Sequence, residues 1–276
     1  MTSPVLSAGI AGIGFWTRGL PSWATARAYL ADGPPSNGMP PTEAPAKPSA
    51  QLLAPNERRR APDTVAVALE VALAACTAAG RDPATLSSVF ASTHGDLAIT
   101  DYMCETLASE PRTISPTRFH NSVHNAAAGY WTIGAGAMAP ATAISAYDAT
   151  FAQGLLEALA QLATGTDAVL LVGYDGAATG PLSRISRSEG LLGGALLLVA
   201  DPQPGMPRLR ASIQEARVGA PVEDAPVENA GPLARLAVGN AMLPMLPLFE
   251  ALGLLRPHAA ITAGSGKILE MEIAYD

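Results

Sequence analysis

The sequence predicts an α/β protein in which helices cover a mostly parallel sheet. Strand-like apolar runs alternate along the chain with longer, helix-compatible segments. Two of the runs, 168–175 and 190–201, are largely apolar at successive positions, which is typical of strands buried on both faces. The composition agrees, because 49% of the residues are hydrophobic and only 15% are charged. So little charge excludes a disordered polyampholyte and a coiled coil.

The expected elements follow in order from their local signals. Helix 63–79 has Asp63 as its expected N-cap and Gly80 in the position of a C-terminal glycine. Strands are predicted at 5–16, 87–93, 141–147, 168–175, 190–201, 208–218 and 267–273. The remaining helices are predicted at 97–108, 121–134 and 148–163, and a helix-like stretch at 233–255.

The distribution of proline along the sequence predicts the domain organisation. Eight prolines fall between Ala31 and Pro62, so we expect an irregular insert at 31–62. The insert closes on the basic run Asn56–Arg60, which suits either a solvated loop or the binding of a carboxylate or phosphate. We predict one domain over 1–200, interrupted by this insert, and a C-terminal extension at 201–276 packed on the same domain.

Charge and composition exclude several functions. Seventeen Lys and Arg residues against 24 Asp and Glu give a net charge of −7, so no nucleic-acid partner is expected. No long uncharged apolar stretch predicts a membrane span, and the N-terminus lacks the basic region of a signal peptide. Two cysteines make neither a disulfide framework nor a zinc site, and no cofactor motif is present. We therefore expect a cytoplasmic protein without cofactor or metal.

The segment 115–164 holds the densest set of reactive side chains. His120 and His124 lie four residues apart, and a strand turns sharply into a helix at Tyr147–Asp148. A side chain at such a turn meets free N–H groups and the positive end of the helix dipole. Enzymes place a thiolate or an oxyanion hole at this kind of position. The turn at Asp148 is therefore the first candidate for chemistry.

The same segment carries a family resemblance. Asn125–Gly129 (NAAAG) and the strand and turn 143–150 (AISAYDAT) resemble the N-terminal half of β-ketoacyl synthases, the condensing enzymes of the thiolase fold. The run Ser115–Asn125 (SPTRFHNSVHN) is similar to that of the half-length, chain-length-factor-like subunits of aryl polyene biosynthesis. The resemblance covers roughly residues 5–200. It implies a thiolase-like βαβαβαββ half-fold.

The resemblance places the family's nucleophilic cysteine at Asp148. A Claisen condensation needs a thiol to hold the acyl group as a thioester, and a carboxylate is a poor acyl carrier. The family's two catalytic histidines belong to a C-terminal half that this chain is too short to contain in full, and His258 lacks a recognisable motif. We therefore predict no catalytic residue and expect Asp148 to cap the following helix.

By resemblance, the chain is expected to be a non-catalytic, chain-length-factor-like partner of a β-ketoacyl-ACP synthase. The heterodimer would act in aryl polyene, polyketide or fatty-acid-type chain elongation, and the partner would receive chains from acyl carrier protein. Thiolase-fold proteins pair through the strand before the nucleophile turn, here 141–147. The side chains expected to line the dimer interface and the acyl tunnel are Phe119, Asn121, Ser122, Val123, His124, Asn125, Tyr130, Ser145 and Tyr147.

Other interpretations remain open. The chain is alternatively a stand-alone acyl-thioester hydrolase or decarboxylase that uses Asp148 or His94, or a structural homodimer. His94 follows a strand end beside Asp96, but a turn in which Asp96 caps the next helix is favoured over a catalytic pair. His120 and His124 have a spacing that suits zinc, without a visible third ligand. Cys104 is either a displaced nucleophile or, more typically for its position, a packed core residue.

Overall fold

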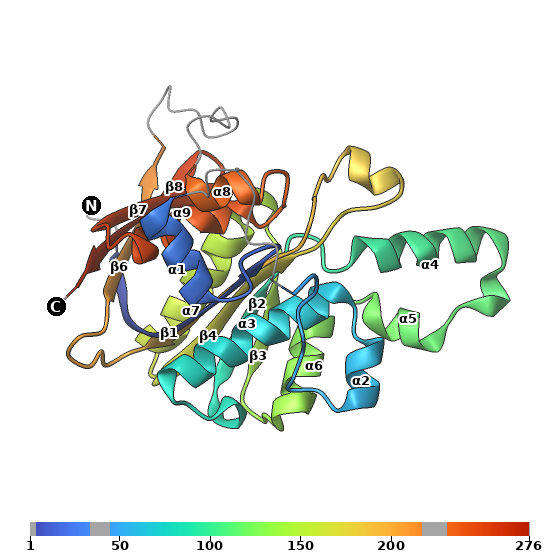
Figure 1. Cartoon of the computed structure of the whole chain (residues 1–276), viewed down its shortest axis with the longest axis horizontal. Helices are drawn as coiled ribbons and strands as arrows, with labels where there is room; N and C mark the ends of the chain where they lie inside the picture. Colours follow the sequence, from blue (N-terminus) through green and yellow to red (C-terminus); the bar gives the residue numbers. More distant parts are fainter. Residues whose placement is uncertain (1–3, 34–44, 217–230, 276) are drawn as a thin grey trace.

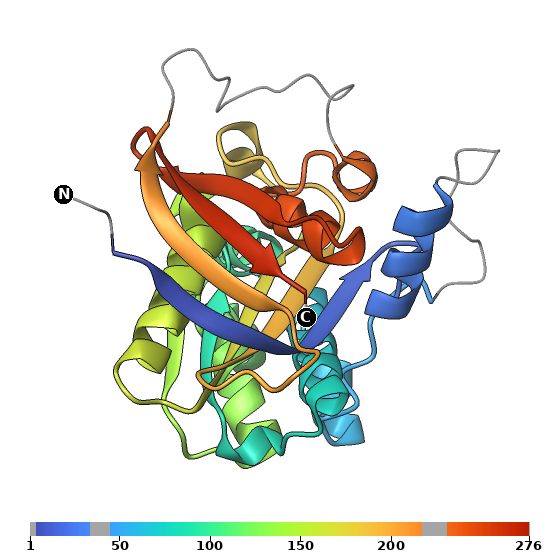
Figure 2. The same ribbon diagram turned by 90° about the vertical axis from the view of Figure 1, so that its left-hand side faces the viewer.

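A computed structural model describes residues 4–33, 45–216 and 231–275. Eight strands form one sheet in the order β3-β2-β4-β5-β1-β6-β8-β7, and helices cover both of its faces (Figure 1). The strands are β1 (Leu6–Thr17), β2 (Ser87–Ala91), β3 (Ala141–Ile144), β4 (Ala168–Asp175), β5 (Leu192–Val199), β6 (Arg208–Glu215), β7 (His258–Gly264) and β8 (Lys267–Ala274). The long strand β1 joins the two halves of the sheet, because its first residues pair with β6 and the rest with β5 (Figure 2).

The pairing of the strands differs from the expectation of a mostly parallel sheet. Of the neighbouring pairs in the described sheet, only β2–β3 and β2–β4 are parallel, and the others are antiparallel. Strands β1 to β4 do run in one direction, because β5 lies antiparallel between β4 and β1. The prediction was wrong about pairing because a central strand is apolar on both faces whichever way its neighbours run.

Helices form two layers around the sheet. They are α1 (Trp23–Asp32), α2 (Pro55–Arg60), α3 (Asp63–Ala79), α4 (Leu97–Ser109), α5 (Pro116–Asn121), α6 (Ala126–Ala135), α7 (Thr150–Ala163), α8 (Pro232–Leu236) and α9 (Leu246–Gly253). Short 3-10 helices lie at η1 (Pro83–Thr85), η2 (Pro111–Thr113), η3 (Tyr147–Ala149), η4 (Pro181–Arg184) and η6 (Leu243–Met245). In the part of the chain that the structure describes, none of the helices has the length and apolar content needed to cross a membrane.

Side chains of the central strands alternate between two hydrophobic cores. In β4, Val169 and Leu171 pack in the core that contains α7, α1 and α9, whereas Leu170 and Val172 pack in the core that contains α3 and α6. All eight residues of β4 are buried, as are all eight of β5. By contrast, α4 and α5 project from the body of the molecule, and α4 buries only Met103 and Thr106 (Figure 1).

Several predicted boundaries need correction. Asp63 is the first residue of α3, and Pro62 occupies the N-cap. The predicted helix 121–134 is two helices, because α5 ends at Asn121 and α6 begins at Ala126. The insert 31–62 contains the helix α2, and its residues 34–44 lie outside the described residues. Residues 217 and 218 of the predicted strand 208–218 also lie outside them.

The C-terminal segment was only partly predicted. In this segment strand β7 was not expected, and the stretch 233–255 divides into α8, η6 and α9. Near the N-terminus, helix α1 was not expected either. Strand β6 pairs with β1 and with β8, and β7 pairs with β8, so these strands continue the sheet of residues 6–199.

Candidate functional site

The polar groups of the candidate site gather at one edge of the sheet. Because β2, β3 and β4 are mutually aligned in parallel, their carboxyl ends meet at the same edge. The loop Ser92–Asp96 follows β2 there, and the turn Ser145–Ala149 follows β3. This is the edge of an open α/β sheet at which ligands most often bind.

A buried carboxylate at the end of β4 holds the loop after β2. Asp175 is completely buried. Its Oδ1 accepts hydrogen bonds from Ser92 Oγ (2.7 Å) and from the backbone N–H of His94 (3.2 Å), and its Oδ2 accepts one from the N–H of Thr93 (2.9 Å). Burial raises the pKa of the Asp175 carboxyl, although the three hydrogen bonds act in the opposite direction. The loop is therefore anchored through its backbone.

The anchored loop in turn contacts the two other predicted segments. His124, in the turn between α5 and α6, brings its Nε2 to 2.7 Å from the carbonyl oxygen of Ser92. Ser145 Oγ, in the turn after β3, donates to the carbonyl oxygen of Thr93 (2.9 Å). Segments that are far apart in the sequence thus meet at residues 92 and 93.

In the turn after β3, the backbone of Tyr147 is strained and the carboxylate of Asp148 does not cap the following helix. Tyr147 takes a left-handed backbone conformation (φ 51°) and its side chain is 78% exposed. Asp148 is exposed in η3, and no side chain caps the N-terminus of α7. Instead, Thr150 Oγ1 accepts from the N–H of Ala146 (2.9 Å) and donates to the carbonyl of Tyr147 (2.6 Å). The expectation that Asp148 caps this helix is therefore wrong.

The hairpin between β7 and β8 closes the site on its other side. Gly264, at the tip, lies so near Ala149 that a Cβ on the glycine would approach the alanine Cβ to 3.3 Å. Gln153 Nε2 donates to the carbonyl of Ala263 (3.1 Å) and ties α7 to the hairpin. A shallow groove of about 650 Å³ runs beside this contact, between α7 and the hairpin.

The predicted pairs of reactive side chains are not assembled. Asp96 caps α4 by accepting from the N–H of Ile99 (3.0 Å), as the favoured interpretation predicted, and His94 approaches Asp175 only through its backbone. His120 packs edge-on against Tyr130, away from the Ser92 contact of His124. The residues that the structure describes include no group of three or more His, Cys, Asp or Glu side chains arranged to bind a metal.

The two cysteines have opposite environments. Cys104 is exposed on α4, so the expectation of a packed core residue is wrong for this side chain. Cys76 is buried in α3, and burial raises the pKa of its thiol to about 12. Neither thiol lies at the turn after β3.

The residues expected at an interface or a tunnel fall into two groups. Asn121 and Tyr130 are buried within the protomer, and Asn121 Nδ2 donates to the carbonyl of Arg60 (3.3 Å). The exposed or half-exposed members are Phe119, Ser122, Val123, His124, Asn125, Ser145 and Tyr147. Ser122 Oγ is bound locally to the carbonyl of Phe119 (2.8 Å). The sequence interpretation missed Asp175, whose only signal was a charged residue at the end of an apolar strand.

Comparison with known proteins agrees with this architecture. A family model described as "Beta-ketoacyl synthase, N-terminal domain" matches residues 34–230. No curated protein matches the sequence. Among solved structures, a chain of the ketosynthase ApeO in complex with its chain length factor ApeC from Xenorhabdus doucetiae is 22% identical, with a TM-score of 0.72. The match covers 97% of this chain and 99% of that chain.

Two further solved structures show how the similarity ranges from whole-chain to partial matches. A chain of the ishigamide ketosynthase/chain length factor is 14% identical with a TM-score of 0.72, and 98% of this chain and 99% of that chain are covered. A ketosynthase from module 1 of the bacillaene synthase from Bacillus amyloliquefaciens FZB42 is also 14% identical, with a TM-score of 0.55. That match covers 77% of this chain and 47% of that chain. The thiolase-like α/β fold with its βαβαβαββ order is thereby confirmed.

Proposed function

Because the chain belongs to the family of β-ketoacyl synthase N-terminal domains, we propose that it is the non-catalytic, chain-length-factor-like partner of a cysteine-bearing β-ketoacyl-ACP synthase. The partner would carry out aryl polyene, polyketide or fatty-acid-type elongation on chains delivered by acyl carrier protein. The observation that carries the proposal is the exposed Asp148 in the turn after β3, a position that the family resemblance assigns to the nucleophilic cysteine.

The chemistry of the turn argues for a partner role. An acyl group carried by a carboxylate is a mixed anhydride, which water hydrolyses readily, so Asp148 is a poor holder of an acyl intermediate. The one buried thiol, Cys76, keeps its proton at neutral pH because its pKa is about 12. The matches to chains from two ketosynthase/chain length factor complexes run from end to end, which supports the same interpretation.

Exposed apolar side chains in the segments that precede and follow the edge strand β3 in the sequence support a protein interface there. Phe119, Val123, Ile133, Met138 and Tyr147 are 60%, 45%, 74%, 95% and 78% exposed. They belong to α5, the turn between α5 and α6, α6 itself and the segments before and after β3. Exposed large apolar side chains are common at interaction sites. Strand β3 itself ends the sheet and pairs only with β2 among the described strands. We propose that the synthase partner adds a strand at this edge.

The register of β3 gives a sharp test of the interface. The carbonyls of Pro140 and Ile144 accept from β2, so in an extended strand the N–H and carbonyl of Ala143 point toward the open edge. Ala143→Pro removes that outward N–H without breaking the ladder to β2. We expect the variant to lose co-purification with the synthase while its thermal unfolding stays close to that of the wild type.

A matched variant lies at the opposite edge of the sheet. Ile273 donates to the carbonyl of Pro257, so Ala260 in β7 likewise directs its N–H outward. Ala260→Pro is expected to co-purify as the wild type does. Equal capture of the Ala143→Pro and wild-type chains would contradict pairing through β3, and a wild-type chain that stays alone would contradict the partner role.

Product length tests the proposed tunnel. Tyr130 and Trp131 pack in the protomer's own core, which leaves Phe119 and Val123 as the bulky side chains free to enter a partner's tunnel. Phe119→Ala removes the exposed ring from the proposed tunnel. The products of the reconstituted heterodimer are therefore expected to shift toward longer chains, measured by mass spectrometry. The control is Val238→Ala, because Val238 is similarly exposed (45%) and lies outside the proposed interface. An unchanged product distribution for Phe119→Ala would remove this residue from the tunnel.

A further inference from the structure

A cleft opens at the carboxyl edge of the sheet, separate from the turn at Asp148. Its volume is about 750 Å³, within the range of about 300–1,000 Å³ found for small-molecule sites. It lies among the end of β1, the beginnings of α3 and α4, the helix α5 and the segment 176–191. None of the residues 145–149 lines it.

Basic side chains outnumber acidic ones around the cleft. Its charged lining residues are Arg18, Lys47, Arg60, Asp63, Asp96 and Arg118. They give a local excess of two positive charges in a chain whose net charge is −7. The cations come from four separate segments, so the fold, and not a run of basic sequence, brings them together.

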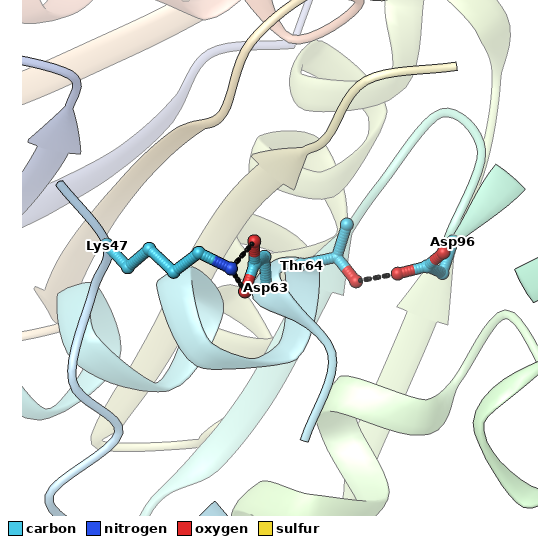
Figure 3. Close-up of polar contacts among 4 residues, drawn as sticks. All are labelled: Lys47, Asp63, Thr64 and Asp96. Carbon is cyan, nitrogen blue, oxygen red and sulfur yellow. Dashed lines mark hydrogen bonds and ion pairs between the residues drawn. The ribbon is translucent and has the colours of Figure 1, made fainter. Parts of the chain in front are cut away.

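Both carboxylates of the cleft already have partners (Figure 3). Asp63 forms an ion pair with Lys47 at 2.9 Å. Asp96 accepts from Thr64 Oγ1 (2.7 Å) with one oxygen, and the other oxygen caps α4. Neither carboxylate is therefore available to neutralise the guanidinium groups around the cleft.

Three guanidinium groups remain without a carboxylate. Within the described ranges, Arg18, Arg60 and Arg118 form no ion pair, and Arg118 lies over the ring of Tyr102 at 4.0 Å from its centroid. That stacking holds the planar guanidinium in place without using its N–H donors. The N-terminus of α3 begins at the same cleft without a side-chain cap, which adds to its positive potential.

The neighbouring arginines of the basic run show that Arg60 differs from them. Arg58 donates to the carbonyl of Leu53 (2.9 Å), and Arg59 donates to Asn56. Arg60 is exposed at the end of α2 and lines the cleft. The fold thus engages two of the three arginines locally and directs the third to the site.

We propose that this cleft binds a phosphate-bearing small molecule. Guanidinium groups offer paired N–H donors whose geometry matches the oxygens of a phosphate. A cleft of this size admits an organic phosphate with an extended body and excludes a folded protein. The proposal concerns this chain alone and does not depend on a synthase partner.

Calorimetric titration of the purified chain tests the site directly. The probes are pyrophosphate and adenosine 5′-monophosphate, with adenosine as the probe that lacks a phosphate. We expect saturable binding of the two phosphates, weaker at higher ionic strength, and no binding of adenosine. Arg60→Gln and Arg118→Gln are each expected to weaken binding about five- to tenfold, since each removes charge-assisted hydrogen bonds at a partly solvated position.

Two control variants make the result specific. Arg81→Gln removes an exposed cation at the other end of α3, where Arg81 pairs with Asp167, and is expected to bind as the wild type does. Arg118→Lys keeps the charge but loses the paired donors, and an affinity between those of the wild type and Arg118→Gln is expected. Equal binding of adenosine and its monophosphate, equal affinity in the Arg60 and Arg81 variants, or no saturable binding by the wild type would each overturn the proposal.

Discussion

At the scale of single residues, Asp175 does the most to shape the candidate site. It is completely buried, and its carboxylate accepts hydrogen bonds from Ser92, Thr93 and His94. No cation offsets its charge among the contacts of the described residues, and burial raises its pKa. A buried carboxyl group of this kind stabilises local geometry at a cost in stability whenever it is ionised.

Asp175→Asn tests this balance. The amide keeps the shape of the carboxyl group but turns an NH₂ toward a donor, so at pH 5 we expect a loss of about 1–3 kcal/mol in the free energy of unfolding. Because the folded-state pKa is raised above the unfolded value of about 3.9, the wild type loses stability as the pH rises through the folded-state pKa. The difference between variant and wild type should therefore shrink from pH 5 to pH 8.

Urea denaturation at both pH values provides the measurement. Asp167→Asn serves as the control, because the Asp167 side chain is 84% exposed and its ion pair with Arg81 is solvated. It should change the free energy of unfolding by less than about 0.5 kcal/mol at either pH. A difference between Asp175→Asn and wild type that grows toward pH 8 would mean that the site favours the ionised carboxylate.

At the scale of elements, the contact between β1 and α3 depends on two glycines. A Cβ on Gly14 would lie 2.0 Å from the carbonyl oxygen of Val71, and one on Gly12 would lie 2.1 Å from that of Ala75. These obstacles are helix backbone, so α3 has to move off the sheet to admit a methyl group. Gly14→Ala is expected to lower the free energy of unfolding by about 3 kcal/mol or more, measured by urea denaturation.

The matched control is a glycine with free space. Gly129 lies inside α6, and a Cβ there meets nothing within 4 Å. Gly129→Ala should raise the free energy of unfolding by about 0.5–1 kcal/mol, because alanine restricts the unfolded chain and favours the helix. A Gly14→Ala variant as stable as wild type would show that α3 and β1 do not pack this closely.

Elements with local boundary signals were predictable from the sequence, whereas elements that depend on pairing were not. Helix α3 and strand β4 were predicted because their boundary signals are local, namely Gly80 after the helix and Asp175 at the end of the apolar run. The direction of β5 is set by pairing across the sheet, to which its own residues give no clue. Strand β7 (HAAITAG) is rich in alanine and glycine and was missed, because it owes its conformation to β8.

The candidate site was predictable in its segments but not in its contacts. A sharp strand-to-helix turn at residues 147–149 follows from local sequence, and the structure contains it. The left-handed conformation of Tyr147 and the exposed, non-capping position of Asp148 do not, because the turn is closed by hydrogen bonds of Thr150 to residues 146 and 147. The first turn of α7 thus has no side-chain cap, and the Thr150 hydroxyl instead closes the turn that precedes the helix.

At the scale of the whole molecule, the second group of strands places its histidine, His258, far from the turn at Asp148. His258 begins β7, whose other end meets the turn, so it lies about 20 Å from that contact along the strand. His124 is bound to the carbonyl of Ser92, and His120 packs against Tyr130. His94 follows β2 in the loop that Ser145 contacts through Thr93. A thiol introduced at position 148 would therefore have one histidine in a neighbouring loop and lack the histidine pair that the family resemblance associates with condensation.

Asp148→Cys makes this argument testable. We expect the variant to take up an acyl group from an acyl thioester slowly, because the thiol lies at the start of α7 without a base. We expect no condensation product from the chain alone. Mass spectrometry of the protein measures acylation, and analysis of released products measures condensation. Condensation above the rate of the Asp148→Ala control would contradict the partner role, as would hydrolysis of acyl thioesters by the wild type that Asp148→Ala abolishes.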